Sequence, residues 1–78
     1  MATRYTINNI TVVSSVEVIV EYTQAVYPGP TYEDLVVTLR REKNWWFEKT
    51  TGVRGEAELV RAADAAARRQ LWTDIGVD

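Results

Sequence analysis

Residues suited to molecular recognition are concentrated between positions 40 and 49. Basic and aromatic side chains follow one another there, in the order Arg40, Arg41, Lys43, Trp45, Trp46, Phe47 and Lys49. Aromatic rings stack on nucleobases while cations follow the phosphates, so the pattern is typical of proteins that bind single-stranded nucleic acid. Tryptophan, tyrosine and arginine also dominate protein-binding hot spots. Two glutamates against four bases leave this stretch a net charge of only +2. We therefore favour a protein partner, with single-stranded nucleic acid bound through residues 40–49 as the alternative.

The sequence contains few of the residue types that commonly carry out catalysis. The chain contains no histidine and no cysteine, which removes the commonest general base, the commonest metal ligand and the thiolate nucleophile. Glu33 and Asp34 are adjacent, and adjacent side chains point apart on a strand. Glu17 and Glu21 would share a strand face, but two carboxylates are too few for a hard metal ion. We expect a protein that is not an enzyme and needs no cofactor or metal.

A second place where a ligand could bind is the segment before the C-terminal helix. Gly52 and Gly55 flank Arg54 there, and the free backbone donors of a helix start can hold an anion. The glycine spacing matches neither the P-loop nor the dinucleotide-binding fingerprint. We keep a small-ligand or anion site at Arg54 as a third hypothesis.

Length and composition limit the size and location of the protein. A chain of 78 residues, 46% of them hydrophobic, predicts one globular domain spanning residues 1–78. The net charge of −2 argues mildly against general nucleic-acid binding. No apolar run approaches the ~20 residues that cross a bilayer, and the N-terminal residues do not resemble a secretion signal. We expect a cytoplasmic protein that is not bound to membranes.

Period-two alternation predicts the strands. Residues 4–13 are rich in β-branched types and carry Asn8 and Asn9, where we expect a bend or bulge. Residues 16–22 alternate cleanly, with valines on one face and two glutamates on the other. A hairpin is expected from residue 34 to residue 51, with its break at residues 41–44. Residues 31–42 could instead form a helix, but three consecutive β-branched residues favour a strand.

The remaining elements are a loop and a helix. Two prolines around a glycine in residues 27–32 predict an exposed loop with a tyrosine at each end, Tyr27 and Tyr32. Residues 56–72 predict an alanine-rich helix whose small side chains allow a close approach to the sheet. Its apolar face consists of Leu59, Val60, Ala63, Ala67 and Leu71.

These elements predict an α+β fold, with an antiparallel meander of about four strands and one C-terminal helix packed on one face. One helix leaves the other face bare. Trp45 and Phe47 share one face and Trp46 takes the other, so at least one large ring should face the bare side. Exposed sheet edges also offer strand addition, including self-association.

We therefore expect a non-catalytic protein-binding module. It would occupy a surface of a larger protein or of its own copy, as a homodimer. Phage-encoded inhibitors of host defence systems are comparable in size and composition, so a viral inhibitor is one expectation. The residues expected to contact the partner are Trp46, Arg40, Arg41, Lys43, Tyr27 and Tyr32. Replacing Trp46 with alanine should then weaken binding by ~2 kcal/mol or more and leave the fold intact.

Overall fold

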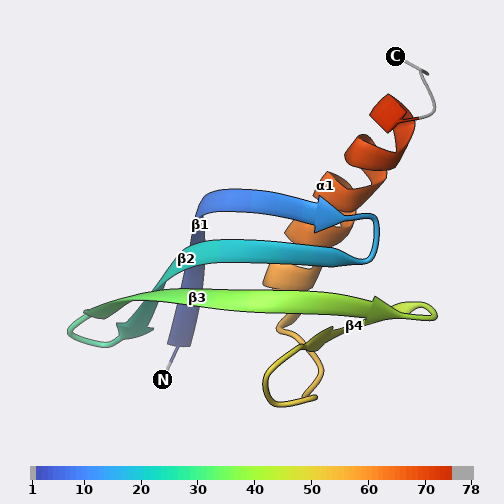
Figure 1. Ribbon diagram of the computed structural model, residues 1–78. Coiled ribbons are helices and arrows are strands. Elements are labelled where there is room, and N and C mark those ends of the chain that lie inside the picture. The colour runs from blue at the N-terminus through green and yellow to red at the C-terminus, as the bar shows by residue number, and fades with distance from the viewer. Residues whose placement is uncertain (1, 75–78) are drawn as a thin grey trace.

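The computed structural model describes the backbone of residues 2–74 and the side chains of residues 2–70 (Figure 1). Its elements are β1 (Ala2–Ser14), β2 (Glu17–Tyr27), β3 (Thr31–Glu42), β4 (Trp45–Glu48) and α1 (Ala57–Asp74). The four strands form one antiparallel sheet in sequential order. The predicted α+β meander with a C-terminal helix is confirmed. Among the described residues, no helix is both long enough and apolar enough to cross a bilayer.

The β2–β3 hairpin is the longest regular part of the sheet. Its register is unbroken from Glu17 opposite Arg40 to Val26 opposite Thr31. The strand interpretation of residues 31–42 is therefore correct, and the helical alternative is wrong. Both strands run up to the Pro28–Gly29–Pro30 turn because no residue before it interrupts the pairing, so β2 extends five residues beyond its predicted end at residue 22.

A bulge in β1 confirms the predicted irregularity at Asn8 and Asn9. The register with β2 shifts between Ile7 and Asn9, and β1 bends sharply in Figure 1. One extra residue reverses the alternation of the side chains beyond it. As a result, Ile7 and Ile10 both pack against the core, although their numbers differ in parity.

The core lies between the sheet and α1. Its buried members are Val18, Val20, Leu39, Trp46, Leu59, Ala63 and Ala67. The predicted apolar face of the helix is confirmed for Leu59, Ala63 and Ala67, while Val60 is half-buried and the side chain of Leu71 lies outside the described residues. Gly55 allows the chain to enter the helix closely, because a Cβ there would lie 2.9 Å from side-chain atoms of both Leu39 and Val60.

The helix covers only part of one face. It packs on β1 and β2, and Figure 1 shows it crossing the strands and projecting past β1, while the tip of the β2–β3 hairpin extends away from it. The molecule is accordingly elongated, measuring 47 × 26 × 16 Å. The opposite face of the sheet, which we call the open face, is left without a helix.

Candidate docking surface

The open face carries the side chains that alternate with the buried ones. Val18, Val20 and Leu39 face α1, so their neighbours in β2 and β3 point the other way. Cross-strand pairing assigns Glu17, Ile19, Glu21, Thr23, Asp34, Val36, Thr38, Arg40, Trp45 and Phe47 to this face. Among them, Val36 is 66% exposed and Trp45 is 51% exposed. Pairing puts Trp45 and Phe47 on the uncovered side of β4, but the Trp45 ring stacks with Arg54 at the rim of the sheet and also lines a groove shared with α1.

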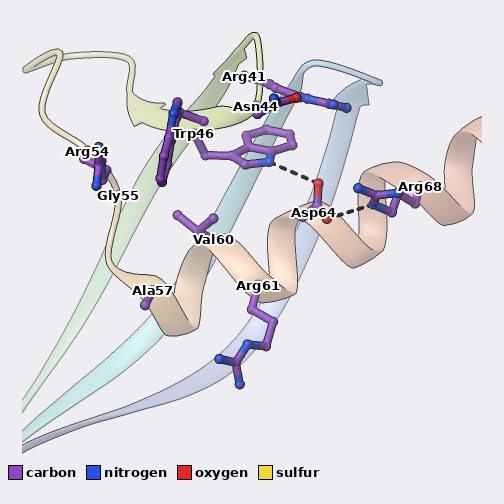
Figure 2. A pocket seen from close by; sticks show the side chains of 11 residues that line it. Arg41, Asn44, Trp46, Arg54, Gly55, Ala57, Val60, Arg61, Asp64 and Arg68 are labelled. Carbon is purple, nitrogen blue, oxygen red and sulfur yellow. Dashed lines mark hydrogen bonds and ion pairs between the residues drawn. The ribbon is translucent and has the colours of Figure 1, made fainter.

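Trp46 lies on the other side, against the helix. It is only 2% exposed, and Figure 2 shows its ring facing α1, with the ring nitrogen directed at Asp64. The reason is the register of the β3–β4 hairpin. Arg41 pairs with Trp46, which puts Trp46 on the same face as Leu39. The prediction that Trp46 contacts a partner and is dispensable for the fold conflicts with this burial.

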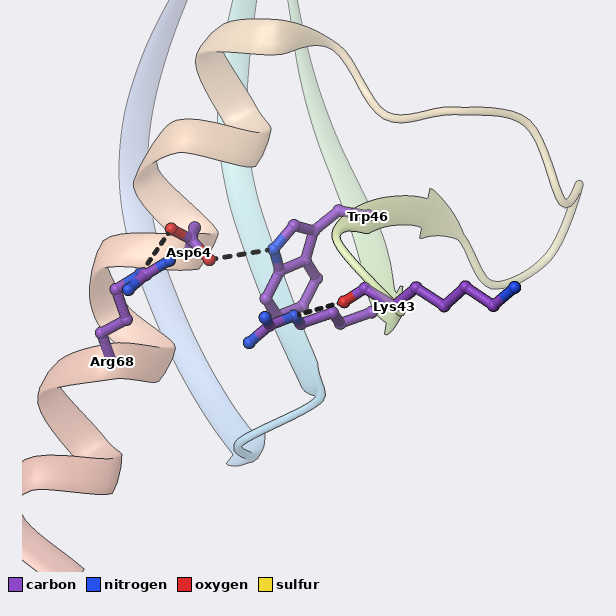
Figure 3. Close-up of polar contacts among 5 residues, drawn as sticks. Lys43, Trp46, Asp64 and Arg68 are labelled. Carbon is purple, nitrogen blue, oxygen red and sulfur yellow. Dashed lines mark hydrogen bonds and ion pairs between the residues drawn. The ribbon is translucent and has the colours of Figure 1, made fainter.

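Asp64 holds Trp46 in place through a short polar chain. Trp46 Nε1 donates a hydrogen bond to Asp64 Oδ1 at 3.3 Å, and Arg68 Nε donates to Asp64 Oδ2 at 2.8 Å (Figure 3). The hydrogen bond from Arg68 lowers the pKa of Asp64 below its usual value, and the bond from Trp46 adds to this, although partial burial opposes both. The ionised form of Asp64 is thus the one that the fold stabilises.

This arrangement predicts how stability depends on pH. Because the pKa of Asp64 is lower in the folded chain than its ordinary value of 3.8, its stabilising contribution is complete above that value. The contribution is lost as the pH falls through the folded pKa. We expect Asp64→Asn to be less stable than the native chain near pH 7, with a smaller difference near pH 3. Urea unfolding of both proteins at the two pH values measures this, and a difference independent of pH would contradict it.

The other predicted contact residues do not form one surface. Arg40 is exposed on the open face, but Arg41 is half-buried on the helix side, where its Nε donates to the backbone oxygen of Lys43 at 2.9 Å. Lys43 lies in the turn with a positive φ of 57°. Tyr32 is eight residues from Arg40 along β3, or about 26 Å at the usual strand rise. Residues 40–49 are thus divided between two faces, and nucleic-acid binding through them stays a prediction.

Tyr27 and Tyr32 do come together, at the base of the proline turn. A hydrogen bond involving the Tyr27 hydroxyl raises the pKa of Tyr32, and Tyr32 is 64% exposed. The Arg4 guanidinium lies 5.7 Å from the centroid of the Tyr27 ring. Ala25, which pairs with both Arg4 and Tyr32, is nearly buried beneath this group. The far end of the open face therefore presents an aromatic and basic cluster.

The outer edge of β3 is the feature that the sequence did not locate. β4 pairs only with residues 39–42, so residues 31–38 have no neighbouring strand on that side within the described chain. Arg41 N donates to Val16 O, which by alternation directs the odd-numbered residues of β3 toward β2. The backbone N–H and C=O groups of Tyr32, Asp34 and Val36 therefore point outward. Consistent with this, the outward-facing Thr38 oxygen accepts a bond from Lys49 N at 2.9 Å.

Three acidic side chains lie on or beside this edge. Glu33 and Asp34 are both exposed, and Glu21 pairs with Val36 on the neighbouring strand. Asp34 Oδ1 accepts a hydrogen bond from Thr23 Oγ1 at 2.7 Å, and Thr23 in turn accepts one from Asn8 Nδ2 at 2.8 Å. This chain of bonds fixes the Asp34 carboxylate beside the open backbone.

No family model matches the chain, and no match was found among curated proteins or solved structures.

Proposed function

We propose that the chain is a non-catalytic protein-binding module that accepts an extended, basic segment of a larger partner along the outer edge of β3. The observation that carries this proposal is the row of outward-pointing backbone groups at Tyr32, Asp34 and Val36. An extended peptide that adds to such an edge gains affinity from main-chain hydrogen bonds and specificity from alternate side chains. Here the flanking side chains are two large exposed ones, Tyr32 and Val36, and one fixed carboxylate.

Charge supports a foreign segment over a second copy of this chain. In an antiparallel self-pairing centred on the edge, Asp34 would lie opposite its own copy, and Glu33 would lie close to the same site. Like charges directly opposite each other destabilise a strand pair. A partner strand bearing lysine or arginine would instead be attracted by Glu33, Asp34 and Glu21. The module would act by occupying this segment of its partner, which is the action of an inhibitor.

A designed peptide tests the proposal directly. The probe is a nine-residue peptide of alternating lysine and valine, blocked at both ends, titrated into the ¹⁵N-labelled protein. We expect saturable amide shifts centred on Tyr32, Asp34 and Val36, since these groups gain hydrogen bonds. The same peptide with glutamate in place of lysine should bind at least about tenfold more weakly, because it meets like charges.

Two controls separate strand addition from simple attraction of charge. A lysine–valine peptide methylated on alternate backbone nitrogens keeps its charge and loses donors, so it should lose most of the affinity. The mass of the protein in solution should stay at 8.9 kDa. Shifts confined to other parts of the protein, undiminished binding of the methylated peptide, or a mass that doubles would each overturn the proposal.

A further inference from the structure

A groove on the helix side of the molecule lies apart from the β3 edge. It has a volume of about 550 Å³ and opens between the β3–β4 turn, the segment leading into α1, and the first turns of α1 (Figure 2). Its lining includes Trp45, Trp46, Val60 and four arginines. A volume of this size is within the range of small-molecule sites.

The charge of the groove is opposite to that of the chain. Arg41, Arg54, Arg61 and Arg68 line it, and Asp64 is the single carboxylate among the lining residues, giving a net charge of +3. The whole chain carries −2. The four arginines come from three places that are separate in sequence. Figure 2 shows Arg41, Arg54 and Arg68 around the region of Trp46 and Val60, whereas the side chain of Arg61 leaves α1 in the direction away from the Trp46 ring. The fold therefore brings arginines that are distant in sequence to the lining of one groove.

Two of these guanidinium groups, those of Arg41 and Arg54, are held in position without being neutralised. Asp64 pairs with Arg68, and within the described part of the chain it is the one carboxylate in an ion pair with any of the four. Arg54 stacks on Trp45, its guanidinium carbon 3.9 Å from the ring centroid. Arg41 donates a hydrogen bond from Nε to the Lys43 carbonyl oxygen, which leaves its two terminal nitrogens available to bind a ligand. A stacked or anchored guanidinium loses less freedom on binding than a free one.

From this arrangement we infer that the groove binds a small molecule carrying a diphosphate or triphosphate group. Guanidinium forks match phosphate oxygens with paired hydrogen bonds, and a net charge of +3 calls for a ligand with several negative charges in a compact group. Ala57, Val60 and the Trp45 ring provide an apolar side to the groove, against which the remainder of a nucleotide would pack. Free pyrophosphate and a nucleoside diphosphate share this chemistry.

Titration of the native chain with pyrophosphate and with ADP tests the inference. At low ionic strength we expect saturable binding of one or both, measured by calorimetry, with amide shifts at Arg54, Gly55 and Arg61. Tighter binding of ADP would identify a nucleotide as the source of the phosphate, and tighter binding of pyrophosphate would identify the free anion. Several charge-assisted hydrogen bonds should give a dissociation constant well below about 10 mM. The inference would be overturned if neither probe showed saturable binding up to about 10 mM.

Matched arginine variants establish where the probe binds. The double substitution Arg54→Gln with Arg61→Gln should weaken binding by about tenfold or more, since it removes two exposed bases from the groove. The double substitution Arg4→Gln with Arg40→Gln changes the net charge equally on the other side of the sheet, and should change binding less than about twofold. Equal losses in the two double variants, or saturation of the groove by a ten-residue oligothymidine more tightly than by ADP, would overturn the assignment to a small ligand.

Discussion

Replacing Trp46 with alanine is expected to lower the free energy of unfolding by about 3–5 kcal/mol, the usual cost of removing a large buried ring. Trp46 is nearly inaccessible, and it lies among Leu39, Leu59 and Ala63 in the core cluster. The alanine side chains of α1 are too short to fill the space that it would leave. The substitution also removes the hydrogen bond that Trp46 donates to Asp64. A domain of this size has a total stability of about 4–12 kcal/mol, so the substitution should remove a large share of it.

Trp45 provides the matched control, because it is the same residue type one position earlier. Half of its surface is exposed, and Arg54 stacks on its ring. Trp45→Ala should therefore cost about 1 kcal/mol or less. Urea unfolding followed by circular dichroism measures both variants without relying on tryptophan emission. Similar losses of stability for the two substitutions would contradict the division of the hairpin into a buried ring and an exposed ring.

The sequence predicts the alternation of these rings but not the face that each one takes. The strands alternate as expected, and the face of Trp46 then depends on whether the β3–β4 turn has an even or an odd number of residues. The turn consists of Lys43 and Asn44, with Lys43 at positive φ. Lysine is not a residue that indicates this conformation, which glycine or asparagine usually provides. The predicted break at residues 41–44 was therefore too long. An even-numbered turn combined with the buried Leu39 would have been enough to place Trp46 in the core.

The open edge of β3 arises from the way β4 ends. Gly52 N donates to Glu48 O, and Glu48 N donates to Val53 O, so the chain turns back after Glu48. Gly52 adopts the positive φ of 72° that this turn requires. Arg54 then bridges to Phe47 on the outer side of β4, and the chain continues into α1 without following β3. Local glycines suggest a turn, but the length of β3 left unpaired depends on pairing between distant residues, which no short sequence pattern specifies.

Replacing Val36 with proline is expected to abolish strand addition at this edge while leaving the sheet folded. The N–H of Val36 points away from β2, so proline removes no bond of the β2–β3 ladder, and edge strands accept proline at such positions. The side chain of Val36 is mostly exposed, which limits the packing that is lost. An added peptide would find no N–H donor at position 36, in the middle of the edge, and the proline ring would lie in its path. We expect the proline variant to bind the lysine–valine peptide at least about tenfold more weakly than the native protein, equivalent to about 1.4 kcal/mol.

Val36→Thr is the control for this substitution. Threonine keeps the N–H, the β-branched shape and the strand preference of valine, so its affinity for the peptide should stay within about threefold of the native value. The amide spectrum of each variant shows whether the β2–β3 pairing is preserved, from Val18 opposite Leu39 to Val26 opposite Thr31. This distinguishes a blocked edge from a damaged sheet. If the proline variant keeps this pairing and binds the peptide as tightly as the threonine variant does, the partner does not add to β3. The acidic groups at Glu21, Glu33 and Asp34 would then attract basic segments only through charge, in a manner that salt would abolish.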